Sequence, residues 1–157
     1  MNEFPTTEVE FPASHIGRFT GRNQLWLDDP ATPFESEGAL EVEPRTVRYR
    51  WAHEGATHEG MIALRGQPDA LEAHWHDTYH AKDGFVFHGF TEGGLLRLYG
   101  IFEAGGTAWG WRIELEWREA ASFTMRMFLV VPEGGSVPAV LLEGARDAAT
   151  GADRARD

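Results

Sequence analysis

The sequence lacks several features that would assign it to a class at once. It contains no cysteine, which excludes disulfide bonds, thiolate metal sites and a cysteine nucleophile. No apolar run approaches the roughly 18 residues that a membrane-spanning helix needs. Residues 1–15 carry acidic side chains and two prolines instead of an apolar stretch, so we expect no secretion signal. We therefore expect a cytoplasmic protein with no membrane partner.

Basic residues are scarce relative to acidic ones. Lysine and arginine number 14 against 25 Asp and Glu, which gives a formal net charge of −11. Nucleic acids and anionic membranes attract proteins through a basic field, so we expect neither as a partner. Solubility is the simplest explanation of the acidity. The chain has 157 residues, of which 42% are hydrophobic, and this is enough for one domain with a core of its own.

Helical periodicity is also missing, and a two-residue period replaces it. In residues 108–117, AWGWRIELEW, the apolar side chains of Trp109, Trp111, Ile113, Leu115 and Trp117 alternate with glycine and charged residues. Successive side chains of a β-strand point to opposite faces of the sheet. The stretch therefore predicts a long strand with one apolar face and one polar face.

The same period returns in nine other segments, joined mostly by short turns that contain glycine. We predict an all-β antiparallel meander, and closure into a barrel would hide the sheet edges most completely. Residues 14–19 would form one short helical turn before it. We assign residues 1–146 to a single barrel domain and 147–157 to a flexible C-terminal tail, because the tail carries no large apolar side chain. The ten predicted strands are 23–27, 36–42, 45–53, 57–64, 70–77, 85–90, 95–102, 108–117, 122–131 and 137–143.

The number of strands suggests what the barrel interior does. An eight-stranded barrel is narrow enough for side chains to fill, whereas about ten strands leave a wider interior that tends to hold water or a ligand. We therefore expect a small, mostly apolar or amphipathic molecule inside. The alternative is a core that its own side chains fill.

Residues 15–21, HIGRFTG, followed by consecutive hairpins, resemble the start of domains of the calycin superfamily, which includes the lipocalins and the fatty-acid-binding proteins. Gly17-Arg18-Phe19 looks like the lipocalin Gly-x-Trp motif with Phe in place of Trp. The later stretch, from Ser36-Glu37-Gly38 through Thr57-His58-Glu59-Gly60, resembles an uncharacterised bacterial family of calycin-like domains. The resemblance covers residues 15–145 and implies a barrel with an internal apolar cavity, but no established chemistry. The Arg-x-Tyr pair with which fatty-acid-binding proteins hold a carboxylate is missing from the last strand.

Aromatic side chains on the predicted strands are candidates for the wall of a ligand cavity, although they would equally serve to fill a core. Arg97 shares its parity with Leu95 and Ile101, so we expect it to face inward. A buried cation is costly unless it is paired, so Arg97 would hold the carboxylate of a ligand. His53 is the second expected polar handle. The predicted aromatic wall consists of Tyr49, Trp51, Trp75, Tyr99, Trp109 and Trp111.

Residues 74–80, HWHDTYH, form the sharpest candidate for a metal site. On a strand, His74 and His76 project to one face about 7 Å apart, a spacing that can chelate one ion, and His80 could return as a third ligand. In the alternative interpretation, Trp75 packs inward and both strand histidines are solvated on the outer face. The parity of Trp75 against the two histidines discriminates between the interpretations.

Two further polar groups lie near strand ends. His53 and His58 flank the turn at 54–56 and could meet across a hairpin mouth as ligands or as an acid–base pair, or they are exposed turn histidines. Asp77 could orient a histidine at the barrel mouth or cap the turn that follows it.

Three hypotheses for function remain. The favoured one is a calycin-like barrel that binds a small apolar ligand, needs no cofactor, is not an enzyme, and has spare apolar faces for a homodimer. The second is a metal-dependent enzyme or metal-binding protein that uses His74, His76 and His80. The third is a structural or interaction module with a filled core.

Overall fold

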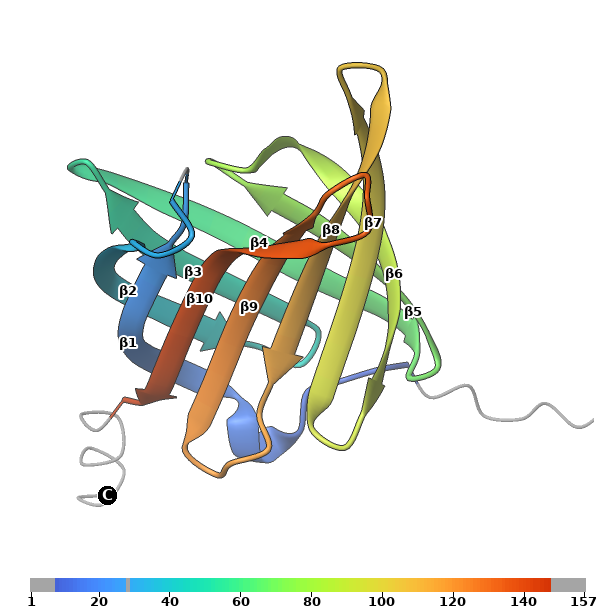
Figure 1. The fold of residues 1–157 in the computed structure, drawn as a ribbon. Coiled ribbons are helices and arrows are strands. Elements are labelled where there is room, and N and C mark those ends of the chain that lie inside the picture. Colours follow the sequence, from blue (N-terminus) through green and yellow to red (C-terminus); the bar gives the residue numbers. More distant parts are fainter. Residues whose placement is uncertain (1–7, 28, 148–157) are drawn as a thin grey trace, which may run out of the picture.

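The computed structural model describes residues 8–27 and 29–147, which form a closed antiparallel barrel of ten strands (Figure 1). Each strand pairs with its neighbours in sequence, and β1 pairs with β10 to close the barrel. This confirms the predicted all-β meander and its closure. The elements are a 3-10 turn η1 (Ala13–His15), followed by β1 (Gly17–Leu25), β2 (Phe34–Val42), β3 (Thr46–His53), β4 (Ala56–Gln67), β5 (Ala70–Asp77), β6 (Ala81–Glu92), β7 (Leu95–Ala104), β8 (Thr107–Glu116), β9 (Ser122–Val130) and β10 (Ser136–Arg146).

The first strand is longer than the sequence pattern indicates. β1 begins at Gly17, which pairs with Val42 of β2, and Phe19 is already inside the barrel opposite Leu40. The predicted short N-terminal helical turn is confirmed, but it covers Ala13–His15 instead of residues 14–19. Residues 17–19 are extended because all three pair with β2, and Phe19 pairs with β10 as well, which satisfies their backbone groups.

The end of the barrel domain lies close to the predicted boundary. β10 ends at Arg146, and the backbone N–H of Asp147 still donates to the carbonyl of Arg18 over 3.0 Å. Of the predicted tail at 147–157, only Asp147 is described, and residues 148–157 lie outside the described residues. None of the helical structure in residues 8–27 and 29–147 has the length and apolar character that crossing a bilayer would demand.

A core of alternating buried side chains lines the inside of the wall. In β8, for example, Trp111, Ile113 and Leu115 are buried, whereas Glu114 and Glu116 lie on the outside. Every strand contributes to the same cluster, so the period of two that marks the sequence is the period of the core. The largest fully buried side chains are Trp51, Trp75, Phe19, Phe87 and Phe123.

The chain before β1 crosses one end of the barrel, which we call the plugged end (Figure 1). The backbone N–H of Val9 donates to the carbonyl of Gly66 (2.8 Å), and that of Phe11 donates to the carbonyl of Pro44 (2.7 Å). The ring of His15 hydrogen-bonds through Nε2 to the carbonyl of Glu119 (2.9 Å). This segment thereby contacts three of the turns at the plugged end, those at β2–β3, β4–β5 and β8–β9.

Aromatic packing seals the plugged end from within. The Phe11 ring meets Trp117 edge-on with centroids 5.2 Å apart and Phe123 with centroids 5.7 Å apart. Phe19 lies 5.7 Å from Phe123 on the other side. Edge-to-face pairs of this kind stabilise beyond the area they bury.

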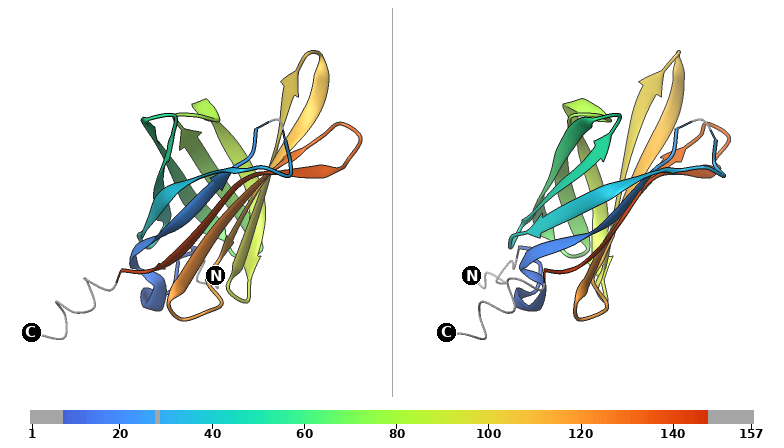
Figure 2. Two further views of the ribbon diagram at one scale, coloured as in Figure 1. Left: turned by 60° about the vertical axis from the view of Figure 1, so that its left-hand side comes forward. Right: turned by 90° about the vertical axis from the view of Figure 1, so that its left-hand side faces the viewer.

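The opposite end, which we call the distal end, carries the turns β1–β2, β3–β4, β5–β6, β7–β8 and β9–β10. The β7–β8 hairpin extends furthest from the body of the barrel there, as the turned views show (Figure 2). Residues 8–16 cross the plugged end and contact none of the distal turns. The two ends of the interior are therefore covered differently.

Two glycines allow neighbouring strands to approach at bends in the barrel wall. A Cβ at Gly21 would lie 1.8 Å from the carbonyl oxygen of Glu143, and a Cβ at Gly89 would lie 1.9 Å from that of Arg97. Both obstacles are backbone atoms of the adjacent strand, so no side-chain movement relieves them. Glycine in a strand commonly marks such close approach.

We expect Gly89→Ala to lower the free energy of unfolding by about 3 kcal/mol or more, because the β6–β7 pairing must shift to admit the methyl group. The matched control is Gly135→Ala, since a Cβ there meets its nearest atom at 3.6 Å. Urea unfolding followed by tryptophan fluorescence measures both variants. Equal stability of the two would contradict the close approach at Gly89.

Candidate functional site

The candidate site lies inside the barrel toward the distal end, around the turn between β5 and β6. β5 ends at Asp77, β6 begins at Ala81, and Thr78, Tyr79 and His80 connect them. Asp77 is fully buried although it is a carboxylate, and it lies on the inward face with Trp75. A buried charge requires hydrogen-bond partners, and the site is built around them.

Asp77 has a donor on both of its oxygens. The backbone N–H groups of Tyr79 (2.6 Å) and His80 (2.9 Å) donate to Oδ1, which fixes the turn after β5. The hydroxyl of Tyr49 donates to Oδ2. Tyr49 in turn accepts a hydrogen bond from the indole Nε1 of Trp75 (2.8 Å). The chain Trp75–Tyr49–Asp77 thus joins β3, β5 and the turn through buried polar contacts.

Protonation states in this network are set by the balance of burial and hydrogen bonding. Burial alone would raise the pKa of Asp77, but contacts from His80 and Tyr49 and the two backbone donors outweigh burial and hold the pKa below its ordinary value. The pKa of Tyr49 is raised well above its ordinary value, by burial first and by the Asp77 charge next. At neutral pH the carboxyl is therefore ionised and the phenol keeps its proton.

Gly60 on β4 provides the space that Tyr49 needs. It is the cross-strand partner of Tyr49, and a Cβ at Gly60 would lie 2.1 Å from Tyr49 Cζ and 2.2 Å from its hydroxyl oxygen. The ring consequently lies flat over the glycine and reaches Asp77. Any side chain at position 60 would displace the Tyr49 hydroxyl, which donates a hydrogen bond to Asp77.

Aromatic rings surround the network on its inner side. Trp75 stacks on Trp111 with centroids 5.4 Å apart and contacts Phe87 at 5.5 Å. The imidazole of His80 lies 5.1 Å from Trp111 and 6.0 Å from Trp51. These rings form a continuous apolar surface drawn from β3, β5, β6, β8 and the β5–β6 turn.

Three polar atoms in this group of rings have no hydrogen-bond partner within residues 8–27 and 29–147. They are Trp51 Nε1, Trp111 Nε1 and His80 Nδ1. His80 Nδ1 lies 4.0 Å from Asp77 Oδ2, beyond hydrogen-bond length. Each unpaired buried group costs about 1–3 kcal/mol. Their occurrence on rings that contact one another identifies this part of the interior as the candidate site.

His53 and His58 lie at the rim of the same site, where both contact the ring of Tyr79. The Tyr79 ring lies 6.2 Å from His53, 4.9 Å from His58 and 4.7 Å from His80. His53 also packs edge-on against Phe34 at 4.9 Å. Both histidines are half-buried instead of exposed, and each of them contacts the Tyr79 ring.

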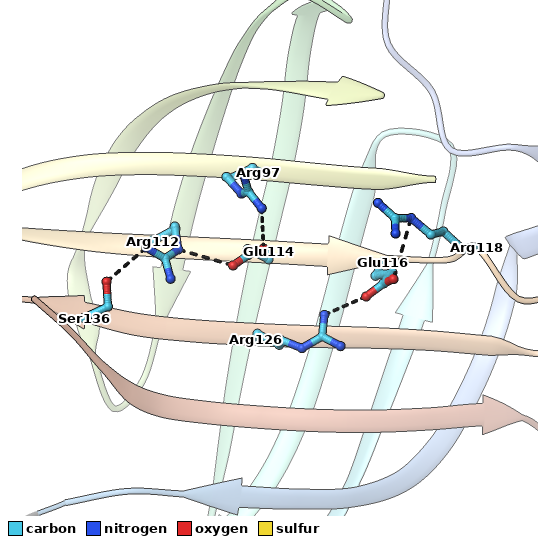
Figure 3. A network of polar contacts seen from close by, with 7 residues as sticks. All are labelled: Arg97, Arg112, Glu114, Glu116, Arg118, Arg126 and Ser136. Carbon is cyan, nitrogen blue, oxygen red and sulfur yellow. Dashed lines mark hydrogen bonds and ion pairs between the residues drawn. The ribbon is translucent and has the colours of Figure 1, made fainter. Parts of the chain in front are cut away.

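The expectation that Arg97 and Tyr99 face inward is wrong. The inward side chains of β7 are Leu96 and Leu98, so the residues between them lie on the outer face. Arg97 pairs there with Glu114 at 3.1 Å, in a ladder of arginines and glutamates along β7, β8 and β9 (Figure 3). In the stretch LLRLY, apolar side chains occur at both odd and even positions, so the sequence alone does not say which set faces inward. The observed orientation buries leucines and leaves the arginine cation in water.

The other predicted wall residues occupy unequal positions. Tyr49, Trp51, Trp75 and Trp111 are buried inside the barrel as expected. Trp109 is half-buried on the part of β8 nearest the β7–β8 turn, where its Nε1 donates to the carbonyl of Ala104 (3.3 Å). It therefore belongs to the rim.

The three histidines of the metal hypothesis do not converge. His74 and His76 are exposed on the outer face of β5, whereas His80 packs inside against Trp111. Among the described residues, no group of three or more His, Cys, Asp or Glu side chains is placed to hold a metal ion. The buried position of Trp75 agrees with the solvated alternative for the two strand histidines.

Sequence reasoning finds the role of Asp77 only in part and misses Asn23. Asp77 caps the turn after β5, as one of its two alternatives predicts, but it also accepts a hydrogen bond from Tyr49, 28 residues away in sequence. Asn23, on β1, is fully buried, and no prediction includes it. Its place in the alternation with Phe19 and Leu25 was the available signal.

The outer wall has features of its own. Two hollows of about 380 and 920 Å³ lie on the outer face of β1–β5, and Arg18, Arg50 and Glu59 line both. On the far side of the barrel, β6 and β7 expose the apolar side chains of Val86, Phe90, Tyr99 and Ile101, the last with 69% of its surface accessible.

No protein-family model matches this chain, and no curated protein matches it. The resemblance to calycin-like domains therefore stays a prediction.

We expect Tyr49→Phe to lower the free energy of unfolding by about 2–4 kcal/mol, because Asp77 Oδ2 and the Trp75 indole N–H each lose their buried hydrogen-bond partner. Tyr99→Phe is the matched control: it removes the same atom from a side chain that is 43% exposed on the outer face. Its expected effect lies within about 0.5 kcal/mol of zero. Chemical unfolding compares the two, and equal effects would contradict the network.

The acid sensitivity of the fold should depend on Asp77. Its pKa is lower in the folded protein than in the unfolded chain, so its contribution is complete above the unfolded value near 4 and is lost as the pH falls through the lower folded value. We expect Asp77→Asn to be less stable at pH 7 and to lose less stability between about pH 5 and pH 2. Asp69→Asn, in the exposed β4–β5 turn, should follow the wild-type profile. Parallel profiles for all three proteins would refute the assignment.

Proposed function

We propose that this protein binds a small, mostly apolar molecule inside the barrel toward its distal end, among Trp51, Trp75, His80 and Trp111. The observation that carries this proposal is the group of three unpartnered buried polar atoms on contacting rings. A hydrophobic core without function would gain stability by replacing such groups with apolar ones of the same shape. A ligand that pairs with them removes the cost.

The chemistry of the unpartnered atoms specifies one part of the ligand. An indole N–H only donates, so Trp51 and Trp111 both require an acceptor. His80 Nδ1 donates or accepts according to its tautomer. A carbonyl oxygen or a comparable neutral acceptor satisfies this set. A charged carboxylate fits less well, because the arginine expected to neutralise it is on the outer surface.

The surrounding surface specifies the rest of the ligand. Trp75 and Trp111 stack with their planes 17° apart, and Phe85 and Phe87 continue the aromatic surface along β6. Flat ring faces favour planar, aromatic or unsaturated molecules. Apolar walls with a few polar groups are the usual composition of small-molecule sites.

The Trp75–Tyr49–Asp77 chain supports the site rather than contacting the ligand through its polar atoms, since its donors and acceptors are engaged with one another. It holds Trp75 and the turn that carries His80 in place. Rigid support of this kind improves binding because less order has to be created when the ligand enters.

Several broader expectations belong with this proposal. The barrel would act by binding rather than by catalysis, in a cytoplasmic setting, as a calycin-like domain. The residues proposed to form polar contacts with the ligand differ from the predicted ones. Trp51, Trp111 and His80 replace Arg97, and His53 lies at the rim of the site. A homodimer stays a prediction.

The proposal is tested with two probes of similar size and different polarity, acetophenone and ethylbenzene. We expect acetophenone to bind about tenfold more tightly, since its carbonyl pairs with the buried donors. Quenching of tryptophan fluorescence and ligand-observed NMR measure both affinities. Trp111→Phe keeps an aromatic ring but removes the donor, and should cut the preference for acetophenone by about threefold to tenfold.

Trp26→Phe is the matched control, because the Trp26 indole already donates to the carbonyl of Pro30 outside the site. It should leave both affinities unchanged. If neither probe binds the wild-type protein, the interior is filled and the interaction-module hypothesis replaces this one. If both bind equally well, the unpartnered donors are not ligand contacts.

A further inference from the structure

Asn23 is the most anomalous polar residue in the barrel. It lies on β1 between the inward-facing Phe19 and Leu25 and has no accessible surface. Neither its Oδ1 nor its Nδ2 has a hydrogen-bond partner within the described ranges. A side-chain amide offers two donors and one acceptor oxygen, and all of this capacity is unused.

The neighbours of Asn23 on the barrel wall do not supply the missing partners. Its cross-strand partners are Ser36 on β2 and Leu142 on β10. The Ser36 hydroxyl accepts from the backbone N–H of Ala52 (3.3 Å) instead. Leu142 is apolar, so the amide is left without a partner from either adjacent strand.

Gly38 places Asn23 beside the candidate site. Gly38 is the cross-strand partner of Trp51, and a Cβ at Gly38 would lie 3.3 Å from Asn23 Cβ and 2.9 Å from Leu142 Cγ. The side chains of Asn23 and Leu142 therefore pack close to the bare backbone of Gly38, which lies on the strand between β1 and β3. Asn23 and Trp51, two buried residues with unpartnered polar atoms, flank the same glycine on the inner wall.

We propose that Asn23 is a second polar subsite of the proposed ligand site and that it recognises a neutral group with an adjacent donor and acceptor, such as a carboxamide or a lactam. This inference rests on the proposed function. An amide is the two-point complement of another amide, since each donates to the oxygen of the other. A ketone or ester would use only the donors of Asn23, and a carboxylate would bring an uncompensated buried charge.

Benzamide and acetophenone test the subsite, because they differ only by an amino group in place of a methyl group. We expect Asn23→Leu to lower the ratio of benzamide affinity to acetophenone affinity by about tenfold, while acetophenone affinity changes by less than about twofold. Gln24→Leu is the control on the same strand, since Gln24 hydrogen-bonds the exposed Glu35 instead of facing the interior. It should leave the ratio unchanged.

Stability provides a second, independent readout. Asn23→Leu replaces an unpartnered amide by an apolar side chain of similar shape, so the ligand-free variant should melt about 2–6 °C above the wild type. Gain of stability with loss of benzamide preference is the signature of a residue retained for binding. A lower melting temperature would show that the amide has partners in the ligand-free protein, such as buried water, and would overturn the proposal.

A measurement on the wild-type protein avoids dependence on any variant. The side-chain amide resonances of Asn23 in an isotope-labelled sample should shift on addition of benzamide and less on addition of acetophenone. Failure of every probe to bind defeats the proposed function, and the subsite with it. Preference for acetophenone over ethylbenzene, together with an unchanged benzamide ratio in Asn23→Leu, defeats the subsite alone.

Discussion

The interior of this barrel is organised around one constraint, the buried charge of Asp77. A carboxylate removed from water must be given donors, and here they come from the backbone of the β5–β6 turn and from Tyr49 on β3. Tyr49 reaches the carboxylate only because Gly60 has no side chain. The position of Trp75 and the path of the chain to His80 follow from the same requirement.

The two ends of the interior differ in how their polar groups are satisfied. At the plugged end, the ring of His15 is hydrogen-bonded to a backbone carbonyl, and aromatic rings pack edge to face. Toward the distal end, polar atoms of Trp51, His80 and Trp111 are buried without partners. Stability accounts for the first arrangement but not for the second. The proposed ligand would account for the second by pairing with these atoms.

The sequence alone predicts the fold better than the site. Alternation and glycine turns indicate ten strands, because a strand that is buried on one face carries apolar and polar residues in alternation. Parity fails where both faces are apolar, as in LLRLY, and Arg97 was placed on the wrong side for this reason. Asp77 and Tyr49 lie 28 residues apart, and no local pattern shows that they meet. The alternation with Phe19 and Leu25 indicates that Asn23 faces inward, but the lack of a partner for its amide depends on β2 and β10, which the local sequence does not show.

Barrel closure also has a consequence for how the chain folds. Nine of the ten strand pairings in the order β1-β10-β9-β8-β7-β6-β5-β4-β3-β2 join consecutive strands, so they need only short loops to close. The β1–β10 pairing alone joins segments more than a hundred residues apart, as Phe19 and Arg146 show. Until that seam forms, two strand edges are free to pair with other molecules. The seam is therefore both the slowest contact to reach and the step that ends exposure to aggregation or strand exchange.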